Sequence, residues 1–327
     1  MTDRGWADSN DLFEPVLEFP DEDAQRWYAS LVGLDIVKER LVKEAIIRLA
    51  PDRLADWSRR HHGQVVPAAA ALLDRPPVFI LAGDIGTGKT ALAESFGDPL
   101  ARAVGIPVFT YRLSLATRGT GLVGEITTLV RDAFATVVAE AKRATQTGKA
   151  RSAFILVIDE ADALAQSREQ GQMHHEDRAG VNALIRGIDE FARDRMPAVI
   201  VLCTNRLDAI DPAVQRRSAE PFLFTRPNAS QREAVLRTYT IGTDTNDADI
   251  AELVALTGSH DGTPGFTYSD LTQRLVPTAV LAAFPDAPLT AAGLLAAARE
   301  TRPTPSFRAD PVATAPRYDG HRALEST

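Results

Sequence analysis

The sequence predicts an α/β fold: a parallel five-stranded sheet with flanking helices, followed by a small all-α lid domain at the C-terminal end. Short apolar runs bounded by turn residues alternate with segments of helical spacing, which is typical of parallel strands buried on both faces. After about residue 226 such runs cease and only helical segments follow. The predicted strands are Val78–Ala82, Ile106–Leu113, Phe154–Ile158, Ala198–Cys203 and Phe222–Phe224.

Changes in composition divide the 327 residues into four predicted parts. Residues 1–28 form an acidic N-terminal arm, and residues 29–226 form the large α/β domain. Residues 227–301 form the small helical domain, and residues 302–327, rich in Pro, Ala and Thr, form a flexible tail. The large domain begins with "LVGLDIVKERLVKEAIIRLA", in which Ile36, Leu41, Ile46 and Ile47 recur at helical spacing, with Asp35 as the expected N-cap.

The overall charge and the cysteine count exclude several classes of function. A net charge of −8 and a pI of about 5.4 disfavour a non-specific binder of nucleic-acid backbones, which needs surplus Lys and Arg. Cys203 is the only cysteine, so the chain has no intrachain disulfide and no thiolate cluster for zinc, in keeping with a reducing, cytoplasmic compartment. We expect no membrane anchor, because no signal peptide and no apolar run of roughly 20 residues is present.

The strongest functional signal directly follows the first predicted strand. "VFILAGDIGTGKTAL" contains Gly83-x-x-x-x-Gly88-Lys89-Thr90 between a strand and a helix, which is the context this motif requires. Glycines let backbone N–H groups turn toward phosphate oxygens, and the helix N-terminus adds positive charge. Lys89 is expected to contact the β- and γ-phosphates, and Thr90 to offer its hydroxyl to Mg²⁺. The predicted phosphate-binding residues are Gly83, Asp84, Ile85, Gly86, Thr87, Gly88, Lys89 and Thr90.

Polar residues at the ends of later strands complete this site. "FILVIDEAD" puts Asp159 and Glu160 at the carboxyl end of an apolar strand, where ligands bind in open α/β sheets. Asp159 is expected to hold Mg²⁺ through its waters, and Glu160 to polarise the attacking water. Asn205, in "AVIVLCTNR", either orients that water or caps its own loop. Arg216 and Arg217 either supply positive charge as the γ-phosphate leaves or form a solvated pair.

Together these motifs resemble the AAA+ ATPases over roughly residues 31–300: a Walker A loop, a Walker B "IDEAD", a sensor-1 asparagine in "CTNR", and "LDAIDPAVQRR" at the arginine-finger position. "LVGLDIVKERL" is similar to the adenine-contacting segment of the family, with Val32, Gly33 and Leu34 against the base. The resemblance implies ATP with Mg²⁺ and a homo-hexamer with a central pore that grips a polypeptide. An arginine finger, Arg216 or Arg217, then acts on the neighbouring subunit's ATP.

Two segments align with the pore loops of that family. "LATRGTGLVGEITTLVRDAF" aligns with pore loop 1, where Leu122 and Val123 are expected to reach the pore unless they belong to the core. "REQGQMHHEDRAGVN" aligns with pore loop 2 and contains His174 and His175. A metal site is disfavoured here, because adjacent residues do not share a helix face and zinc ligands are usually spaced more widely. We interpret the histidines as a polar pore lining that contacts the client and is sensitive to pH.

The finer resemblance is to the pachytene-checkpoint-type remodellers of HORMA-domain proteins, especially the bacterial members in cyclic-oligonucleotide antiphage signalling (CBASS) operons. It rests on "YRLSLATRGTG", "MHHEDRAGVNALIRGID", "CTNRLDAIDPAVQRR" and "GFTYSDLTQRLVPT". Two departures are present. Only about 30 residues precede "VGLD", too few for the substrate-recruitment domain of the eukaryotic members. Their sensor-2 arginine aligns near Ser269, and Arg274 is the nearest candidate to replace it.

The resemblance implies an ATPase that engages a HORMA-domain protein through its pore and releases it from a complex with a cyclic-oligonucleotide synthase (CD-NTase). One alternative is a generic AAA+ unfoldase or disassembly ATPase for another protein client. A nucleic-acid-associated AAA+ ATPase is disfavoured by the acidic pI and by the lack of a basic stretch interleaved with aromatics. A nucleotide-dependent switch without turnover is disfavoured by intact Lys89, Asp159, Glu160 and Asn205.

Overall fold

The computed structural model describes residues 12–115, 125–146, 149–166, 176–260 and 262–307. By their contacts these residues divide into two compact units. The first comprises Met1–Gly83 with Gly88–Phe224, and the second comprises Asp84–Thr87 with Thr225–Thr327. The middle of the predicted phosphate loop therefore groups with the C-terminal unit. Within the described ranges, no helix is long and apolar enough to cross a membrane.

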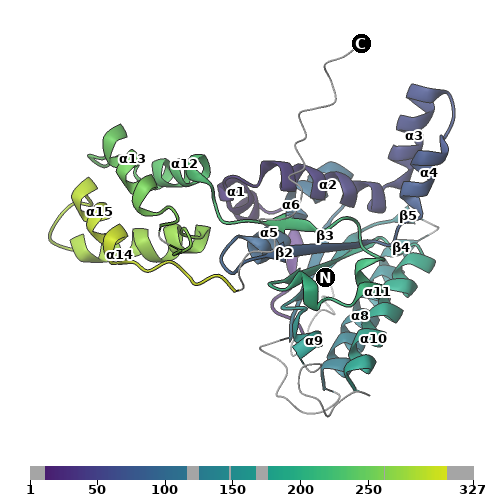
Figure 1. The fold of residues 1–327 in the computed structure, drawn as a ribbon. Coiled ribbons are helices and arrows are strands. Elements are labelled where there is room, and N and C mark those ends of the chain that lie inside the picture. Colours follow the sequence, from purple (N-terminus) through teal and green to yellow (C-terminus); the bar gives the residue numbers. More distant parts are fainter. Residues whose placement is uncertain (1–11, 116–124, 147–148, 167–175, 261, 308–327) are drawn as a thin grey trace, which may run out of the picture. The chain divides into compact units, whose positions relative to one another are not determined.

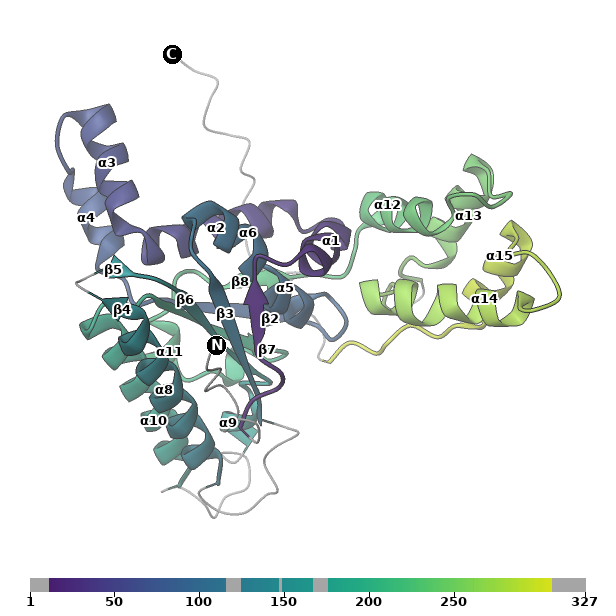
Figure 2. The ribbon, with the colours of Figure 1, turned by 180° about the vertical axis from the view of Figure 1, so that it is seen from behind.

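The first unit is built on a six-stranded sheet with the order β1-β3-β6-β7-β2-β8 (Figures 1 and 2). The five predicted parallel strands are confirmed: β2 (Val78–Gly83), β3 (Val108–Ser114), β6 (Ala153–Asp159), β7 (Ala198–Thr204) and β8 (Phe222–Phe224). All seven residues of β6 and of β7 are buried, which explains their continuous apolar sequence.

The sixth strand is a correction to the predicted sheet. β1 (Leu17–Phe19) pairs antiparallel with β3 at the edge of the sheet, within the segment predicted to be an arm. Its three residues lie between Pro15 and Pro20, so the run is too short to show strand periodicity in the sequence. A separate two-stranded ribbon joins β4 (Thr145–Gln146) and β5 (Lys149–Ala150).

Helices cover both faces of the large sheet (Figure 1). On one face, α8 (Glu125–Ala144) and α10 (Glu176–Arg193) bury side chains against alternate strand residues such as Ile80, Leu156 and Ile200. On the other face, α2 (Asp35–Leu49), α5 (Lys89–Ser95) and α6 (Gly97–Val104) pack against Phe79, Ile155 and Val201. The other described helices of the unit are α1 (Glu22–Ser30), α3 (Pro51–His62), α4 (Pro67–Leu73), α9 (Ala163–Gln166), η1 (Leu207–Ala209) and α11 (Pro212–Gln215).

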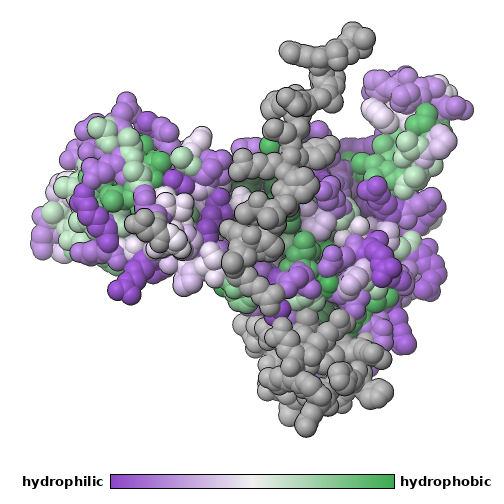
Figure 3. Space-filling model, viewed as in Figure 1, coloured by the Kyte–Doolittle hydropathy of each residue, from purple (hydrophilic) through white to green (hydrophobic). Residues whose placement is uncertain are grey.

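Helix α2 confirms the predicted helix but differs from the prediction in two details. Asp35 is its first residue, and the N-cap position is Leu34, which makes no side-chain cap bond. Ile36 is 84% exposed, so the buried stripe runs instead through Lys38, Leu41 and Ala45. From the end of α2, α3 and α4 extend as a pair, with mainly hydrophilic residues over α3 and hydrophobic residues over α4 (Figure 3).

After Phe224, the regular elements among the described residues of the second unit are all helices, as predicted. It contains α12 (Ala229–Tyr239), α13 (Asp247–Leu256), the π-helical η2 (Asp270–Leu275), α14 (Val276–Ala283) and α15 (Ala291–Glu300). Capping boxes at Asn228 and Asn246 begin α12 and α13. The predicted tail starts at Arg302, and its described part is bonded to this unit: Thr304 Oγ1 donates to Asp270 Oδ1 at 2.6 Å.

Candidate active site

The loop between β2 and α5 has the backbone that its glycines predict. Gly86 and Gly88 have φ angles of +75° and +96°, in the region that favours glycine. A Cβ atom on Gly83 would lie 2.1 Å from the Phe224 carbonyl oxygen, so no side chain fits there. The buried Lys89 ammonium donates to the Gly83 carbonyl oxygen at 2.9 Å. The loop thus curls around its own lysine at the start of a helix, as a phosphate-binding loop requires.

The two predicted magnesium ligands lie side by side. Thr90 Oγ1, in the first turn of α5, donates to Asp159 Oδ2 at 3.1 Å. Asp159 ends β6 and is buried. A hydroxyl and a carboxylate that converge in this way are hard oxygen donors of the kind Mg²⁺ prefers. The residues present therefore fit Mg²⁺ bound together with nucleotide phosphates.

Glu160 is held beside Asp159 by a strained backbone and a side-chain hydrogen bond. Its φ of +54° is unusual for a residue other than glycine, and such strain is common at functional sites. The Ser114 hydroxyl, at the end of β3, donates to Glu160 Oε2 at 3.2 Å. Ser114 was not predicted as a site residue. Ser114 lies opposite Asp159 on the neighbouring strand, and this pairing could not be known before the pairing of β3 with β6 was known.

Arg112, also on β3, is a second residue that sequence reasoning missed. Its Nη2 donates to Asp159 Oδ2 at 2.9 Å, and its Nη1 lies 2.5 Å from Glu94 Oε1. Burial raises the pKa of the Glu94 carboxyl, and the Arg112 charge opposes that rise. The guanidinium compensates two carboxylates and orients Asp159. An arginine inside the otherwise apolar run "IPVFTYRL" was the available signal.

Asp162, the last residue of "DEAD", fixes the turn that carries Asn205. Its buried carboxylate accepts from Thr204 Oγ1 at 2.9 Å and from the Asn205 backbone N–H at 3.3 Å. The Ala161 N–H donates to the Cys203 carbonyl oxygen at 2.9 Å and joins the same two segments. Asn205 therefore follows the end of β7 directly, where its backbone is bonded to the Walker B segment through Asp162.

We expect Asp162→Ala to lower kcat of ATP hydrolysis by about tenfold, because Asn205 loses the bonds that orient its turn. The free energy of unfolding should fall by about 2 kcal/mol, because the buried Thr204 hydroxyl loses its acceptor. Steady-state hydrolysis and urea denaturation measure the two effects. Asp208→Ala, on the neighbouring η1, is the control. An Asp162→Ala variant with wild-type kcat would show that the turn keeps its orientation without this carboxylate.

The two predicted arginines have different environments. Arg217 makes a bidentate pair with Asp189 on α10, at 2.7 and 3.1 Å, and this bond raises its pKa. Arg216 is exposed, and its Nε donates to the Pro212 carbonyl oxygen at 3.2 Å. Arg217 is thus engaged within its own chain, whereas Arg216 presents its guanidinium at the surface.

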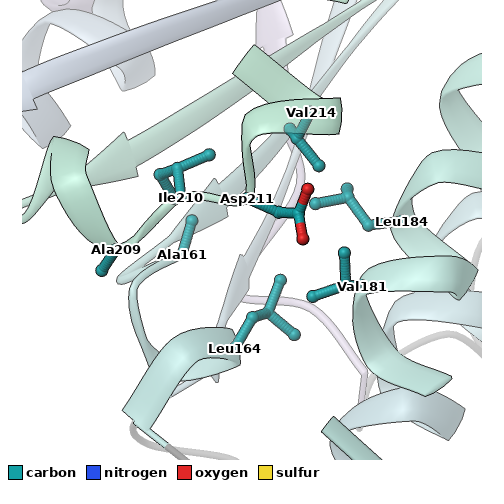
Figure 4. A pocket seen from close by; sticks show the side chains of 8 residues that line it. All are labelled: Ala161, Leu164, Val181, Leu184, Ala209, Ile210, Asp211 and Val214. Carbon is teal, nitrogen blue, oxygen red and sulfur yellow. The ribbon is translucent and has the colours of Figure 1, made fainter. Parts of the chain in front are cut away.

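An apolar cavity separates the Walker B segment from the helix that precedes these arginines (Figure 4). Ala161 and Leu164 line one side, and Ile210 and Val214 line another. The Asp211 carboxylate points toward it and caps α11 by accepting from the Ala213 N–H at 2.7 Å. The cavity is completed by Val181 and Leu184 of α10 and by Ala209. Apolar contacts around this cavity therefore set the position of α11 against α9 and α10.

The predicted adenine-contacting segment lies next to the phosphate loop. Gly33 has a φ of +76°, and Leu34 is buried. A Cβ atom on Gly88 would lie 3.4 Å from Leu34 Cδ1, so this side chain reaches the loop. Val32 is half-buried just before the turn. Leu34 therefore lies against the phosphate loop at Gly88, and Val32 and Gly33 directly precede it in the sequence.

The predicted pore residues and the residues near the sensor-2 position remain to be placed. The pore residues Leu122, Val123, His174 and His175 lie outside the described residues. In the second unit, the Ser269 N–H donates to the Gly86 carbonyl oxygen at 3.1 Å. Arg274 instead pairs with Asp270, its Nη1 lying 2.9 Å from Oδ1. The Ser269 backbone thus bonds to the phosphate loop at Gly86, whereas the Arg274 side chain is bonded within its own helix.

Comparisons with known proteins agree with this geometry. The profile of the "ATPase family associated with various cellular activities (AAA)" matches residues 79–226. CD-NTase-associated protein 6 of Escherichia coli (strain MS 115-1) is 50% identical over 91% of this chain and 96% of its own length. The chain therefore belongs to the AAA family of ATPases, and it is a nucleotide-binding ATPase.

Within that family its similarity is to CD-NTase-associated protein 6 and to Trip13 proteins. The structure of the E. coli MS115-1 HORMA:CdnC:Trip13 complex contains a chain that is 49% identical. That match has a TM-score of 0.83 and covers 90% of this chain and 97% of the other. Rhizobiales Trip13 is 41% identical with a TM-score of 0.70, covering 89% of this chain and 99% of that one.

Proposed function

We propose that this ATPase is a hexameric protein remodeller that opens a bacterial HORMA-domain protein and releases it from a cyclic-oligonucleotide synthase in CBASS antiphage signalling. One observation carries this proposal. The chain is 49% identical, over 90% of its length, to a chain in the structure of a HORMA:CdnC:Trip13 complex. The geometry of the nucleotide site supports it, because the Lys89 ammonium lies within its loop and the Thr90 hydroxyl is hydrogen-bonded to the Asp159 carboxylate. The remodelling is taken to be cytoplasmic, beside the synthase.

ATP is held by the backbone of Gly83–Gly88, by the Lys89 ammonium and, at its base, by Val32, Gly33 and Leu34. Mg²⁺ would be held near Thr90 and Asp159, and it supplies charge neutralisation as the γ-phosphate leaves. Glu160 accepts the proton of the attacking water, and Ser114 and the backbone strain keep its carboxylate beside Asp159. Asn205 orients the same water from the end of β7, with its turn fixed by Asp162.

The arginine finger is Arg216, which acts on the ATP of the neighbouring subunit. The exposed Arg216 guanidinium can reach phosphates bound to a neighbouring subunit at little cost in free energy. Arg217 would first have to break a bidentate ion pair with Asp189. Arg217 has a different role: through Asp189 it joins the arginine segment to α10. The sequence directly before α10 contains His174 and His175, which we predict to line pore loop 2.

Replacing both His174 and His175 by Ala should slow opening of the HORMA protein at least fivefold, with a much smaller change in ATP hydrolysis. The imidazoles are expected to contact the client, and the pore of the double variant lacks these polar contacts. Single-turnover opening, followed by a fluorophore pair on the HORMA protein, measures this effect. His61→Ala/His62→Ala, on the exposed end of α3, is the control. Equal opening by both double variants would contradict the assignment, and Leu122→Ala/Val123→Ala tests pore loop 1 in the same way.

Capture of the client tests the proposed function. Glu160→Gln subunits loaded with ATP should retain the HORMA protein, because substrate release then waits on hydrolysis that does not occur. The retained protein is identified after incubation with a lysate that expresses the synthase and the HORMA protein. Lys89→Ala, which should not bind ATP, is the control and should retain nothing. Recovery of DNA, or of other clients without a HORMA protein, would refute this function and favour the alternatives of a nucleic-acid-associated or generic AAA+ ATPase.

A further inference from the structure

The phosphate loop contains an acidic side chain that the ATPase mechanism does not use. Asp84 follows Gly83 directly, and its side chain is only 13% exposed. Its Oδ1 accepts the loop's own Ile85 N–H at 3.0 Å, so the carboxylate lies against the backbone that is expected to bind phosphate. A buried carboxylate at this place repels the polyphosphate unless a cation compensates it.

Arg226, which lies 142 positions further along the chain, supplies the cation that compensates the Asp84 carboxylate. Its Nε and Nη2 lie 2.9 and 2.5 Å from Asp84 Oδ2, and its own side chain is only 14% exposed. Its Nη1 donates to the Gly265 carbonyl oxygen at 2.6 Å. Arg226 lies two positions after β8, where the chain passes from the first unit to the second. The guanidinium therefore joins the loop to two segments of the second unit.

Further bonds hold the same stretch of loop. The Phe307 N–H donates to Asp84 Oδ1 at 3.2 Å, and the Ser269 N–H donates to the Gly86 carbonyl oxygen. A Cβ atom on Gly86 would lie 2.7 Å from Thr267 Oγ1, so only glycine permits this approach. These contacts explain why Asp84–Thr87 group with the second unit rather than with the sheet. The shape of the phosphate loop thus depends on residues far from it in sequence.

We propose that Arg226 is a positioning residue for ATP, acting through Asp84. Its guanidinium cancels the Asp84 charge and fixes residues 84–87 to the second unit, so that the backbone donors face the phosphates. This inference deepens the proposed function and rests on the phosphate site assigned above.

A double-mutant cycle tests this inference. Arg226→Met should raise the Kd for ATP with Mg²⁺ at least about tenfold, because the Asp84 carboxylate beside the phosphates loses the positive charge of its Arg226 partner. Asp84→Asn should lower the Kd, because the negative charge beside the phosphates is lost and Arg226 remains as a cation. The double variant should return to within about threefold of wild type, because neither buried charge is left alone. Titration of the full-length protein with a fluorescent ATP analogue measures each Kd.

Three controls make the result decisive. Arg237→Met removes an arginine of the same unit that pairs with exposed carboxylates, and it should leave the Kd unchanged. Thermal unfolding shows whether each variant folds, and if Arg226→Met does not, Arg226→Lys should give a smaller defect that Asp84→Asn again relieves. A double variant as impaired as the Arg226 single variant, or an Arg226 variant with wild-type affinity, overturns the inference alone. Absence of ATP binding in the wild type overturns the phosphate site as well.

Discussion

Glu160→Gln should lower kcat of ATP hydrolysis by about 10³-fold while leaving ATP bound, because an amide cannot accept the proton of the attacking water. The substitution preserves the shape of the side chain, and its carbonyl oxygen still accepts from Ser114. Lys89, Thr90 and Asp159 are unchanged, so the affinity for ATP with Mg²⁺ should stay within about twofold of wild type. The two quantities thus separate chemistry from binding.

Steady-state phosphate release and nucleotide titration measure these effects on one preparation. Glu39→Gln, which alters an exposed glutamate of α2 paired with Lys43, is the matched control and should behave as wild type. Lys89→Ala should fail in both assays, because the charge expected to bind the phosphates is lost. A Glu160→Gln enzyme that retained a tenth of the wild-type kcat would show that another group accepts the proton.

The second large effect is expected at the boundary between subunits. Arg216→Ala should lower kcat by about 10³-fold, because the transferring phosphoryl group loses the cation that stabilises its charge. Arg217→Ala should lower kcat of ATP hydrolysis by a smaller factor, because the Arg217 guanidinium is already paired with Asp189. Its expected defect is in coupling: ATP turnover continues while opening of the client slows. Arg217→Ala with the larger loss of kcat would exchange the two assignments.

Mixing variants shows whether Arg216 acts across the boundary. Arg216→Ala subunits retain an ATP site, and Lys89→Ala subunits retain Arg216. Each variant alone should be inactive, but the proposed hexamers, when they contain both variants, should hydrolyse ATP wherever a Lys89→Ala subunit presents its arginine to an intact site. Activity that rises with the mixing ratio supports action in trans. Mixtures as inactive as their components would mean that Arg216 acts within its own subunit or has another role.

The parts of the site that follow from local sequence were the most predictable. The phosphate loop, Asp159 and Glu160 each belong to a contiguous motif at a strand end. The pattern of apolar runs was therefore enough to predict that Thr90 and Asp159 lie close together, as they do. The same pattern predicted the five parallel strands and the helical C-terminal unit. The short strand β1 was missed because its pairing with β3, rather than its own periodicity, makes it a strand.

Residues that act through distant partners could not be predicted. Asp84 and Arg226 are 142 positions apart, and no motif links them. Arg112 and Ser114 become site residues only because β3 lies beside β6. Arg216 and Arg217 are adjacent in sequence and similar in chemistry, and only the position of Asp189 on α10 distinguishes them. In each case the information lies in the packing of elements, which local sequence patterns do not reveal.

ATP-dependent release of the HORMA-domain protein from its synthase is the most direct test of the proposed function. The purified complex of HORMA protein and cyclic-oligonucleotide synthase is mixed with the ATPase, and dissociation is followed by fluorescence anisotropy of a labelled HORMA protein. The proposed function predicts rapid release with wild type and ATP, and none with Glu160→Gln or without nucleotide. A complex that stays intact while the wild-type enzyme hydrolyses ATP would contradict it.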